Sequence, residues 1–229
     1  MDWYGHSIPA MRLEARFGDR VVPAFCERPK SIWAMVSDAA SQNPDGEALV
    51  CGDRRMTWRE VVQQSAKIAT GFRKFGLQSG DRVALLLGNR IEFVLTMFGA
   101  AHAGLVTVLL STRQQKPEIA YVLSDCGAKL LIHEATLADR LPEARDVPGL
   151  IHRIFVDDGG ESQFSGLIGN EPSPQPATVH EEDTAMILYT SGTTGRPKGA
   201  MLAHCNVIHS AMIFASCLQL SAADRKSVV

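Results

Sequence analysis

Hydrophobic residues recur along the chain with two different periods, and this predicts helices that alternate with strands. Apolar positions follow helical spacing over 31–42 and again over 57–75. The second segment begins with a capping-box pattern, in which Glu60 follows Thr57 at the required spacing. Two amphipathic helices are therefore expected in the first third of the chain.

Short apolar runs between these helices predict strands. Residues 48–51 and 55–57 flank a turn at 52–54 and indicate a small hairpin. The run at 83–87 is apolar without alternation, which is typical of a strand buried on both faces of a parallel sheet. Further elements are expected as helices at 91–103, 117–125 and 206–218 and as strands at 105–109, 129–133, 153–156 and 184–188. This order predicts a layered α/β domain with a mostly parallel sheet.

One apolar stretch, 93–110, has eighteen residues without Asp, Glu, Lys or Arg. That length just reaches the minimum for a membrane-spanning helix. Gly99, His102 and Gly104 favour a different interpretation, in which a buried helix ends near Ala103, Gly104 caps it, and a strand follows. No transmembrane segment is therefore expected, and the start of the chain lacks the apolar core of a signal peptide.

The composition changes between residues 157 and 178. This stretch contains three prolines and four glycines together with acidic residues. Such a composition predicts a surface connection rather than a core element.

The segment 189–199, YTSGTTGRPKG, combines features that bind phosphate. Its glycines allow the tight turns that point successive N–H groups inward, and its hydroxyls and lysine add donors and a positive charge. The residues concerned are Thr190, Ser191, Gly192, Thr193, Thr194, Gly195, Lys198 and Gly199. The segment lies between an expected strand and an expected helix. A strand, a Gly-rich loop and a helix in that order are the usual arrangement for holding phosphate.

Two common phosphate-binding patterns do not fit this segment. In the pattern G-x-x-x-x-G-K-[ST] counted from Gly192, Pro197 replaces the second glycine and Gly199 replaces the hydroxyl residue. The dinucleotide pattern G-x-G-x-x-G is also absent here. A merely flexible loop is the alternative, and the flanking strand and helix speak against it.

The composition favours a globular protein in a reducing setting. Hydrophobic residues make up 45% of the 229 residues, and 23 basic side chains stand against 25 acidic ones without a long run of either sign. This distribution gives no indication of a nucleic-acid surface. The five cysteines are widely spaced and form no C-x-x-C pair, so a cytoplasmic location is expected.

The segment YTSGTTGRPKGAMLAH resembles the signature loop of the adenylate-forming superfamily, which includes acyl- and aryl-CoA synthetases, adenylation domains of peptide synthetases, and luciferases. The resemblance extends to MTWREV at 56–61, to the strand–helix–strand unit at 80–110, and to the helix and strand at 116–132. Residues 109–113 depart from the pattern, because LLSTR stands where many members have a Pro and an Asn-Pro pair.

The resemblance implies an ATP-dependent ligase. In the family, a carboxylate attacks the α-phosphate of ATP, pyrophosphate leaves, and a thiol, usually that of coenzyme A, takes the acyl group from the adenylate. For this chain the resemblance implies that residues Thr190 to Lys198 contact the β- and γ-phosphates and that Thr190 lies near Mg²⁺. Lys198 would be catalytic, because its charge stabilises the departing pyrophosphate. A solvated surface lysine is the alternative interpretation of Lys198.

Two other groups of polar residues are weaker candidates. His204, Cys205 and His209 lie close in sequence, but no further ligand at suitable spacing supports a metal site, and His204 is expected to help begin a helix. Glu134 and the acidic pair at 157–158 could serve in acid–base chemistry, but nothing places them near the loop. Solvated turns are the expected setting for these carboxylates.

The resemblance also divides the chain. Residues 1–28 are expected to be an N-terminal extension, and 29–229 an incomplete N-terminal AMP-binding domain, with the C-terminal domain of the family absent. The expected function is that of the N-terminal portion of an ATP-dependent carboxylic acid–CoA ligase that uses ATP, Mg²⁺ and CoA. A truncated, noncatalytic fragment that binds a nucleotide or a partner is the alternative, and an unrelated α/β binding domain would require the whole motif to be coincidental. The acid substrate and the oligomeric state are left open.

Overall fold

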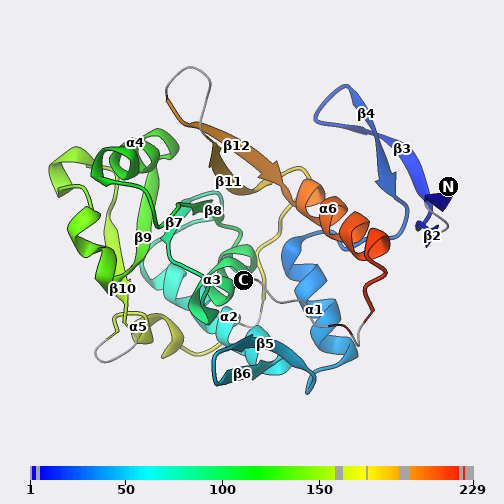
Figure 1. Ribbon diagram of the computed structural model, residues 1–229, viewed down its shortest axis with the longest axis horizontal. Helices are drawn as coiled ribbons and strands as arrows, with labels where there is room; N and C mark the ends of the chain where they lie inside the picture. Colours follow the sequence, from blue (N-terminus) through cyan, green and yellow to red (C-terminus); the bar gives the residue numbers. More distant parts are fainter. Residues whose placement is uncertain are drawn as a thin grey trace.

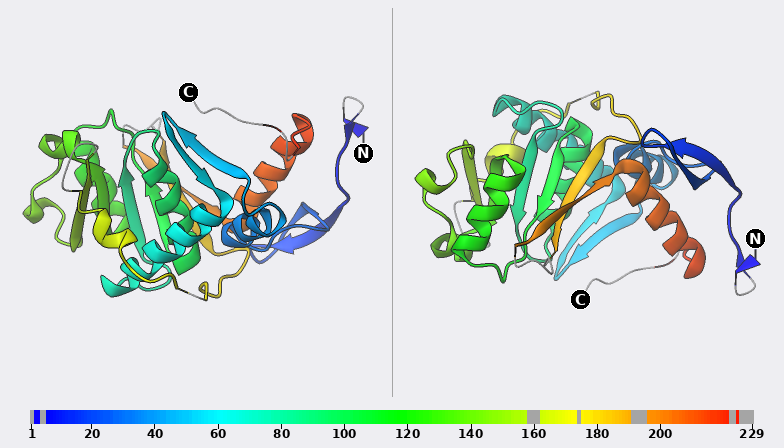
Figure 2. Two further views of the ribbon diagram at one scale, coloured as in Figure 1. Left: turned by 90° about the horizontal axis from the view of Figure 1, so that it is seen from below. Right: turned by 90° about the horizontal axis from the view of Figure 1, so that it is seen from above.

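The computed structural model of the chain describes residues 2–3, 6–157, 162–173, 175–190, 196–221 and 224. At its centre lies a six-stranded sheet with the strand order β10-β9-β7-β8-β11-β12 (Figures 1 and 2). Neighbouring strands are parallel from β10 to β11, and β12 runs antiparallel to β11 at the end of the sheet. The strands are β7 (Arg82–Leu86), β8 (Val106–Leu109), β9 (Ala128–Glu134), β10 (His152–Val156), β11 (Thr184–Thr190) and β12 (Lys198–Ala203).

Helices cover both faces of this sheet. Helices α2, α3 and α5 share one core cluster with the sheet, and α4 shares a second cluster on the opposite face. A third cluster joins α1 to α3, β11 and α6. The helices are α1 (Ile32–Gln42), α2 (Trp58–Lys74), α3 (Ile91–Ala103), α4 (Lys116–Cys126), α5 (Ser165–Ile168) and α6 (His204–Cys217), with 3₁₀ turns η1 (Ala135–Arg140) and η2 (Ala144–Asp146).

Consecutive residues of β7 are buried on opposite faces of the sheet. Val83 and Leu85 belong to the cluster that contains α2 and α3, whereas Ala84 and Leu86 belong to the cluster that contains α4. None of the four side chains is more than 1% exposed. The predicted burial of this strand on both faces is confirmed, and with it the layered α/β fold with a mostly parallel sheet.

The predicted helix ends are also confirmed. Helix α1 begins after Ser31, whose hydroxyl accepts a hydrogen bond from the Ala34 amide at 3.1 Å. The capping box of Thr57 and Glu60 is complete at the start of α2. Gly104 ends α3 in the left-handed conformation, with φ of 72°, so the apolar stretch divides into α3 and β8. No helix in the described ranges is long and apolar enough to cross a bilayer.

Short antiparallel hairpins lie outside the central sheet. They are formed by β1 (Asp2–Trp3) with β2 (His6–Ser7), by β3 (Met11–Arg16) with β4 (Arg20–Phe25), and by β5 (Glu47–Cys51) with β6 (Arg54–Thr57). The β5–β6 hairpin confirms the prediction for this region. The β3–β4 hairpin falls in the residues assigned to an N-terminal extension and was not expected as an element.

The prediction of a surface connection over 157–178 is wrong for the middle of that stretch. Phe164 and Leu167 are 3% and 0% exposed, and both belong to the core cluster with α2. Phe164 immediately precedes the short helix α5 and Leu167 lies within it, so their spacing of about one helical turn directs both side chains to that cluster. The average composition of the stretch hid these two apolar residues among the glycines and prolines.

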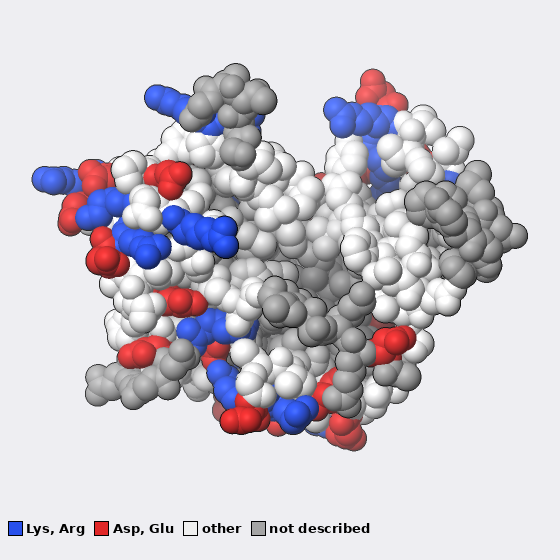
Figure 3. All heavy atoms as spheres, in the orientation of Figure 1, with Lys and Arg blue, Asp and Glu red and all other residues white. Residues whose placement is uncertain are grey.

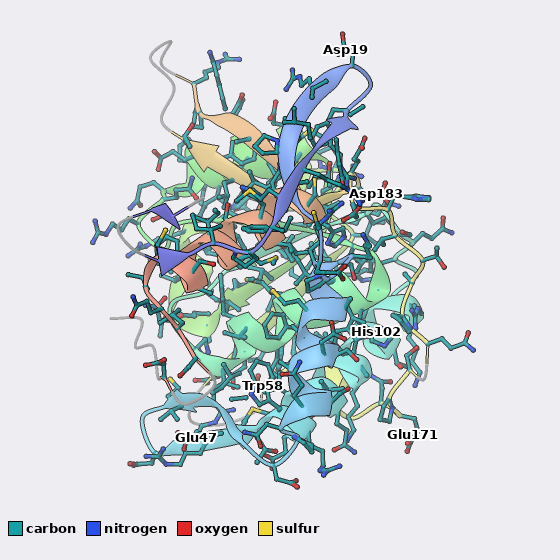
Figure 4. All side chains as sticks on the ribbon, turned by 90° about the vertical axis from the view of Figure 1, so that its right-hand side faces the viewer. Asp19, Glu47, Trp58, His102, Glu171 and Asp183 are labelled. Carbon is teal, nitrogen blue, oxygen red and sulfur yellow. The ribbon has the colours of Figure 1, made fainter. Side chains whose placement is uncertain are left out.

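The last part of the same stretch runs across α2 and α3. The Thr70 hydroxyl of α2 donates to the Glu171 carbonyl at 2.8 Å, and the Ala177 amide donates to the carbonyl of His102 in α3 at 2.8 Å. Figure 4 labels His102 and Glu171 on this side of the molecule. These hydrogen bonds hold the segment that leads into β11.

Candidate phosphate-binding site

Strands β11 and β12 form a hairpin whose ends carry the first and last polar residues of the predicted loop. Thr190 is the register partner of Lys198, and Tyr189 is the partner of Gly199. The hairpin lies at the top of Figure 1. The structure thus brings Thr190 and Lys198 opposite each other. The remaining predicted contacts, Ser191, Gly192, Thr193, Thr194 and Gly195, lie outside the described residues.

The predicted order of strand, loop and helix is wrong, because β12 lies between the loop and α6. Residues 198–203 pair along the whole of β11, and α6 begins only at His204. Five strand residues lie between Lys198 and His204 at the start of α6, and the six residue steps correspond to about 20 Å at roughly 3.4 Å per residue. The amino-terminal dipole of α6 therefore cannot serve an anion at Lys198, and the positive charge there must come from the side chains and the loop itself.

Opposite residues of an antiparallel pair point to the same face of the sheet, and successive residues alternate. Ile187 and Tyr189 pack against the cluster that contains α4. Thr190 and Lys198 consequently point to the other face, and both residues are exposed. Within the described part of the chain, Lys198 has no ion-pair partner. Its ammonium is therefore available to an anionic ligand beside the Thr190 hydroxyl.

Tyr189 and α4 make the polar contacts on the opposite side of the hairpin. The Tyr189 hydroxyl donates a hydrogen bond to Asp125 Oδ2 at 2.5 Å, and its ring meets the Tyr121 ring edge-on, with centroids 6.5 Å apart. The guanidinium of Arg196 lies 6.0 Å from the Tyr121 ring centroid. Burial, and after it the hydrogen bond to Asp125, raises the pKa of Tyr189 well above its ordinary value.

Sequence reasoning missed this group of contacts. Tyr121 and Asp125 are spaced i, i+4 within a predicted helix, and this spacing places them on the same helix face. Nothing local connects them to Tyr189, because Asp125 and Tyr189 are 64 residues apart. Only the parallel sheet, which places α4 over β11, brings the two segments together.

Gly199 leaves room for the Tyr189 ring. A Cβ atom at Gly199 would lie 2.9 Å from Ile187 Cγ2 and 3.0 Å from Tyr189 Cζ. Real Cβ atoms are rarely so close to other heavy atoms, so a larger residue would push these side chains aside. Gly199 is therefore needed for close packing across the hairpin.

His204 begins α6, as predicted, and also joins α6 to α1. Its ring is 2% exposed, and Nδ1 accepts a hydrogen bond from the Ile32 amide at 3.3 Å. Burial lowers the pKa of His204, which is consistent with a neutral ring that accepts at Nδ1. Among the described residues, no group of three or more His, Cys, Asp or Glu side chains could hold a metal ion.

The weaker carboxylate candidates lie apart from the hairpin. Glu134 Oε1 accepts a hydrogen bond from the Gly88 amide at 2.7 Å, so Glu134 holds the turn after β7. Its strand, β9, is three strand spacings from β11, or about 14 Å. Asp157 follows β10 at the far end of the sheet, and Asp158 is outside the described residues.

The fold and the hairpin define the class of protein, and comparisons with known proteins agree. The chain is similar in structure to the inhibitor-bound N-terminal domain of FACL13 from Mycobacterium tuberculosis. The TM-score is 0.69 and the identity 33%, and the match covers 76% of this chain and 44% of that one. A long-chain-fatty-acid–CoA ligase from Archaeoglobus fulgidus matches with a TM-score of 0.79, covering 93% of this chain and 44% of that one. Its identity of 23% supports the fold alone.

The family model described as "AMP-binding enzyme" matches residues 36–228, and the chain belongs to this family. It is 33% identical over 201 residues to the long-chain-fatty-acid–CoA ligase FadD13 of Mycobacterium tuberculosis, covering 86% of this chain and 39% of the relative. It is 36% identical over 168 residues to a feruloyl-CoA synthase of Amycolatopsis, covering 73% of this chain and 32% of that relative. The chain therefore spans about two fifths or less of these relatives, and it matches only part, 44%, of the FACL13 N-terminal domain.

Proposed function

We propose that this chain is the N-terminal portion of an ATP-dependent carboxylic acid–CoA ligase and that residues 190–199 bind the β- and γ-phosphates of ATP. One observation carries the proposal. The hairpin places Thr190 and Lys198 on the same face, at the two ends of the Gly- and Thr-rich segment, and Lys198 has no ion-pair partner among the described residues. The family match over 36–228 supports the reaction class. A domain boundary between residues 28 and 29 stays a prediction.

The chemistry requires negative charge to be stabilised on the leaving group. An acid carboxylate attacks the α-phosphate, the bond from that phosphorus to the bridging oxygen breaks, and pyrophosphate departs with the bond electrons. A fixed ammonium at Lys198 lowers the energy of this developing charge, because it is already in place when the bond breaks. The acyl-adenylate then gives its acyl group to the thiol of CoA, and AMP is released.

Mg²⁺ fits the donor set at the hairpin. The ion prefers oxygen ligands, keeps several waters, and commonly takes only one or two protein oxygens together with substrate phosphates. The exposed hydroxyl of Thr190 supplies one such oxygen beside the phosphate site. Thr190 is therefore proposed as the ligand that this chain provides, and Mg²⁺ would neutralise part of the charge of the β- and γ-phosphates.

A cytoplasmic location is part of the same proposal. All five cysteines are free, as expected for a chain in a reducing compartment where the thiol of CoA is also maintained.

The experiment is ATP binding and ATP–pyrophosphate exchange with the purified chain and a panel of acids that includes long-chain fatty acids and hydroxycinnamic acids. Lys198→Ala should weaken Mg·ATP binding at least about tenfold, because a charged hydrogen-bond donor is lost. Any exchange activity should fall about a hundredfold, which is typical for removal of one stabilising donor. Lys116→Ala is the matched control, because Lys116 is an exposed α4 lysine 3.5 Å from Glu143, and it should behave as wild type.

Equal effects of the two lysine substitutions would refute the phosphate role of Lys198. Binding of Mg·ATP without exchange would support the second candidate function, a noncatalytic nucleotide-binding fragment.

A further inference from the structure

The β11–β12 hairpin is at the end of the sheet, so one of its arms has a strand neighbour on only one side. β11 pairs with β8 and β12, whereas β12 pairs with β11 alone among the described strands. The first four residues of β12, from Lys198 to Met201, are all exposed. The sheet by itself therefore holds the outer arm weakly, and the position of Lys198 needs further support.

That support comes from α4, which contacts the inner arm and a residue just before the outer arm. Tyr189, on the inner arm, donates to Asp125 Oδ2 at 2.5 Å. Arg196, just before the outer arm, lies 6.0 Å from the centroid of the Tyr121 ring, within range of a cation–π contact. The rings of Tyr121 and Tyr189 meet at 86°. Tyr121, Asp125, Tyr189 and Arg196 are called the hairpin anchor below.

The anchor lies on the face of the hairpin opposite to the phosphate side chains. Tyr189 immediately precedes Thr190, so fixing the Tyr189 side chain against α4 turns the Thr190 side chain to the other face. Gly199, across from Tyr189, adds no side chain and lets the ring lie close to the backbone of the outer arm. The contact with α4 thereby determines the direction of Thr190 and of its partner Lys198.

We propose that Tyr189 and Asp125 are positioning residues for phosphate binding: their hydrogen bond, together with Arg196 on Tyr121, fixes the hairpin on α4 and so holds Thr190 and Lys198 in place. The inference rests on the proposed function for the identity of the ligand. The anchoring itself does not depend on that function, and it has its own measurement.

The test compares Tyr189→Phe, Asp125→Ala and Asp125→Asn in the full chain. Phenylalanine keeps the ring and loses the donated hydrogen bond, and asparagine keeps an oxygen that can accept it. Asp45→Asn is the matched control, because Asp45 is an exposed carboxylate that pairs with Arg59 away from the hairpin. The two readouts are hydrogen–deuterium exchange of the amides in 184–190 and 198–203 and the dissociation constant for Mg·ATP.

Tyr189→Phe and Asp125→Ala should each raise the exchange of the β12 amides and weaken Mg·ATP binding by roughly five- to tenfold, as for the loss of one hydrogen bond. In both readouts, Asp125→Asn should give values between those of these variants and wild type. Asp45→Asn should match wild type in both. If Asp125→Asn restores part of what Asp125→Ala loses, the effect comes from the hydrogen bond and not from a general loss of packing.

The remaining outcomes are distinguishable. Unchanged hydrogen–deuterium exchange in Tyr189→Phe and Asp125→Ala overturns the anchor, whether or not Mg·ATP binding changes. Raised exchange with an unchanged Mg·ATP dissociation constant overturns the positioning role. A third outcome is that wild type binds no Mg·ATP while the substitutions raise hydrogen–deuterium exchange as expected. In that case the anchor stands, but the phosphate proposal is wrong, and so is the positioning role that rests on it.

Discussion

Two hairpins flank one face of the molecule, and they are held in opposite ways. The β3–β4 hairpin is fixed by ion pairs, in which Arg28 bonds to Glu14 at 2.8 Å and to Glu181 at 2.7 Å. The β11–β12 hairpin is fixed by one neutral donor, Tyr189, and by the contact of Arg196 with an aromatic ring. Figure 3 shows Lys and Arg atoms at the outer ends of both hairpins and mostly uncharged atoms between them.

The difference agrees with the binding role proposed for Lys198, because only one of the two hairpins has its cation engaged in ion pairs. Arg28 has a side chain that is 5% exposed, and its positive charge is shared by two carboxylates. Such a cation stabilises the structure, and the two carboxylates cancel most of the positive electrostatic potential that could attract an anionic ligand. Lys198 is exposed, and within the described ranges it has no carboxylate beside it. Holding that hairpin through Tyr189 leaves the charge of Lys198 free for an anion.

The largest expected effect comes from breaking the ion cluster of the β3–β4 hairpin. Arg28→Ala should lower the free energy of unfolding by about 3 kcal/mol, because the poorly exposed Arg28 guanidinium loses its charged hydrogen bonds to Glu14 and Glu181. Arg16 would remain as the second cation that contacts both carboxylates. Urea denaturation measures this change. Arg12→Ala is the control, since Arg12 also pairs with Glu14 but is 62% exposed. It should cost less than about 0.5 kcal/mol, and equal losses in the two variants would contradict the role assigned to burial.

The sequence predicted the centre of the fold well because its signals there are local. The run at 83–87 is apolar on both faces, and Gly104 follows an apolar helix, so pattern and structure agree. The β3–β4 hairpin escaped prediction because its strands are largely solvent-exposed, with Leu13 72% exposed and Pro23 inside β4. Strand β12 escaped for a related reason, since its small residues pair with β11 through the backbone and carry little hydrophobic pattern.

The candidate site was predictable only in part. The Gly- and Thr-rich motif predicts Thr190 and Lys198 as site residues, and the two lie opposite each other in the hairpin. Their ligand remains a proposal. The anchor could not be read from the sequence, because α4 and β11 become neighbours only when the parallel sheet forms.

A smaller effect is expected from closing the space beside Tyr189. Gly199→Ala should cost about 1–3 kcal/mol of unfolding free energy, because the new Cβ collides with Ile187 and the Tyr189 ring. Thermal or urea unfolding measures the loss, and Mg·ATP binding should weaken in parallel. Gly149→Ala is the control, since a Cβ at Gly149 meets nothing within 4 Å. It should change stability by less than about 0.5 kcal/mol. A stable Gly199→Ala variant would mean that the hairpin tolerates a shifted Tyr189.

The smallest expected effects are local changes with pH, which should occur in different pH ranges for the two hairpins. Hydrogen bonds from Arg28, Arg12 and Arg16 lower the pKa of Glu14 to about 2. A carboxylate with a lowered pKa adds stability above its ordinary pKa, and this stability is lost as the pH falls toward the folded value. The β3–β4 hairpin should therefore loosen as the pH falls from about 4.5, the ordinary value for Glu14, toward 2. Amide NMR signals of residues 11–25 should report this loosening.

The β11–β12 hairpin should respond at the other end of the pH scale. The pKa of Tyr189 is raised by burial and by its hydrogen bond to Asp125, so its contribution is complete below the ordinary tyrosine pKa of about 10 and is lost as the pH rises beyond it. Tyrosinate absorbance of wild type minus Tyr189→Phe should show one group that titrates above the ordinary range. If Tyr189 titrates near its ordinary pKa, its side chain is not held in the buried contact with Asp125, and the contrast between a hairpin held by ion pairs and a hairpin held through a tyrosine hydroxyl fails.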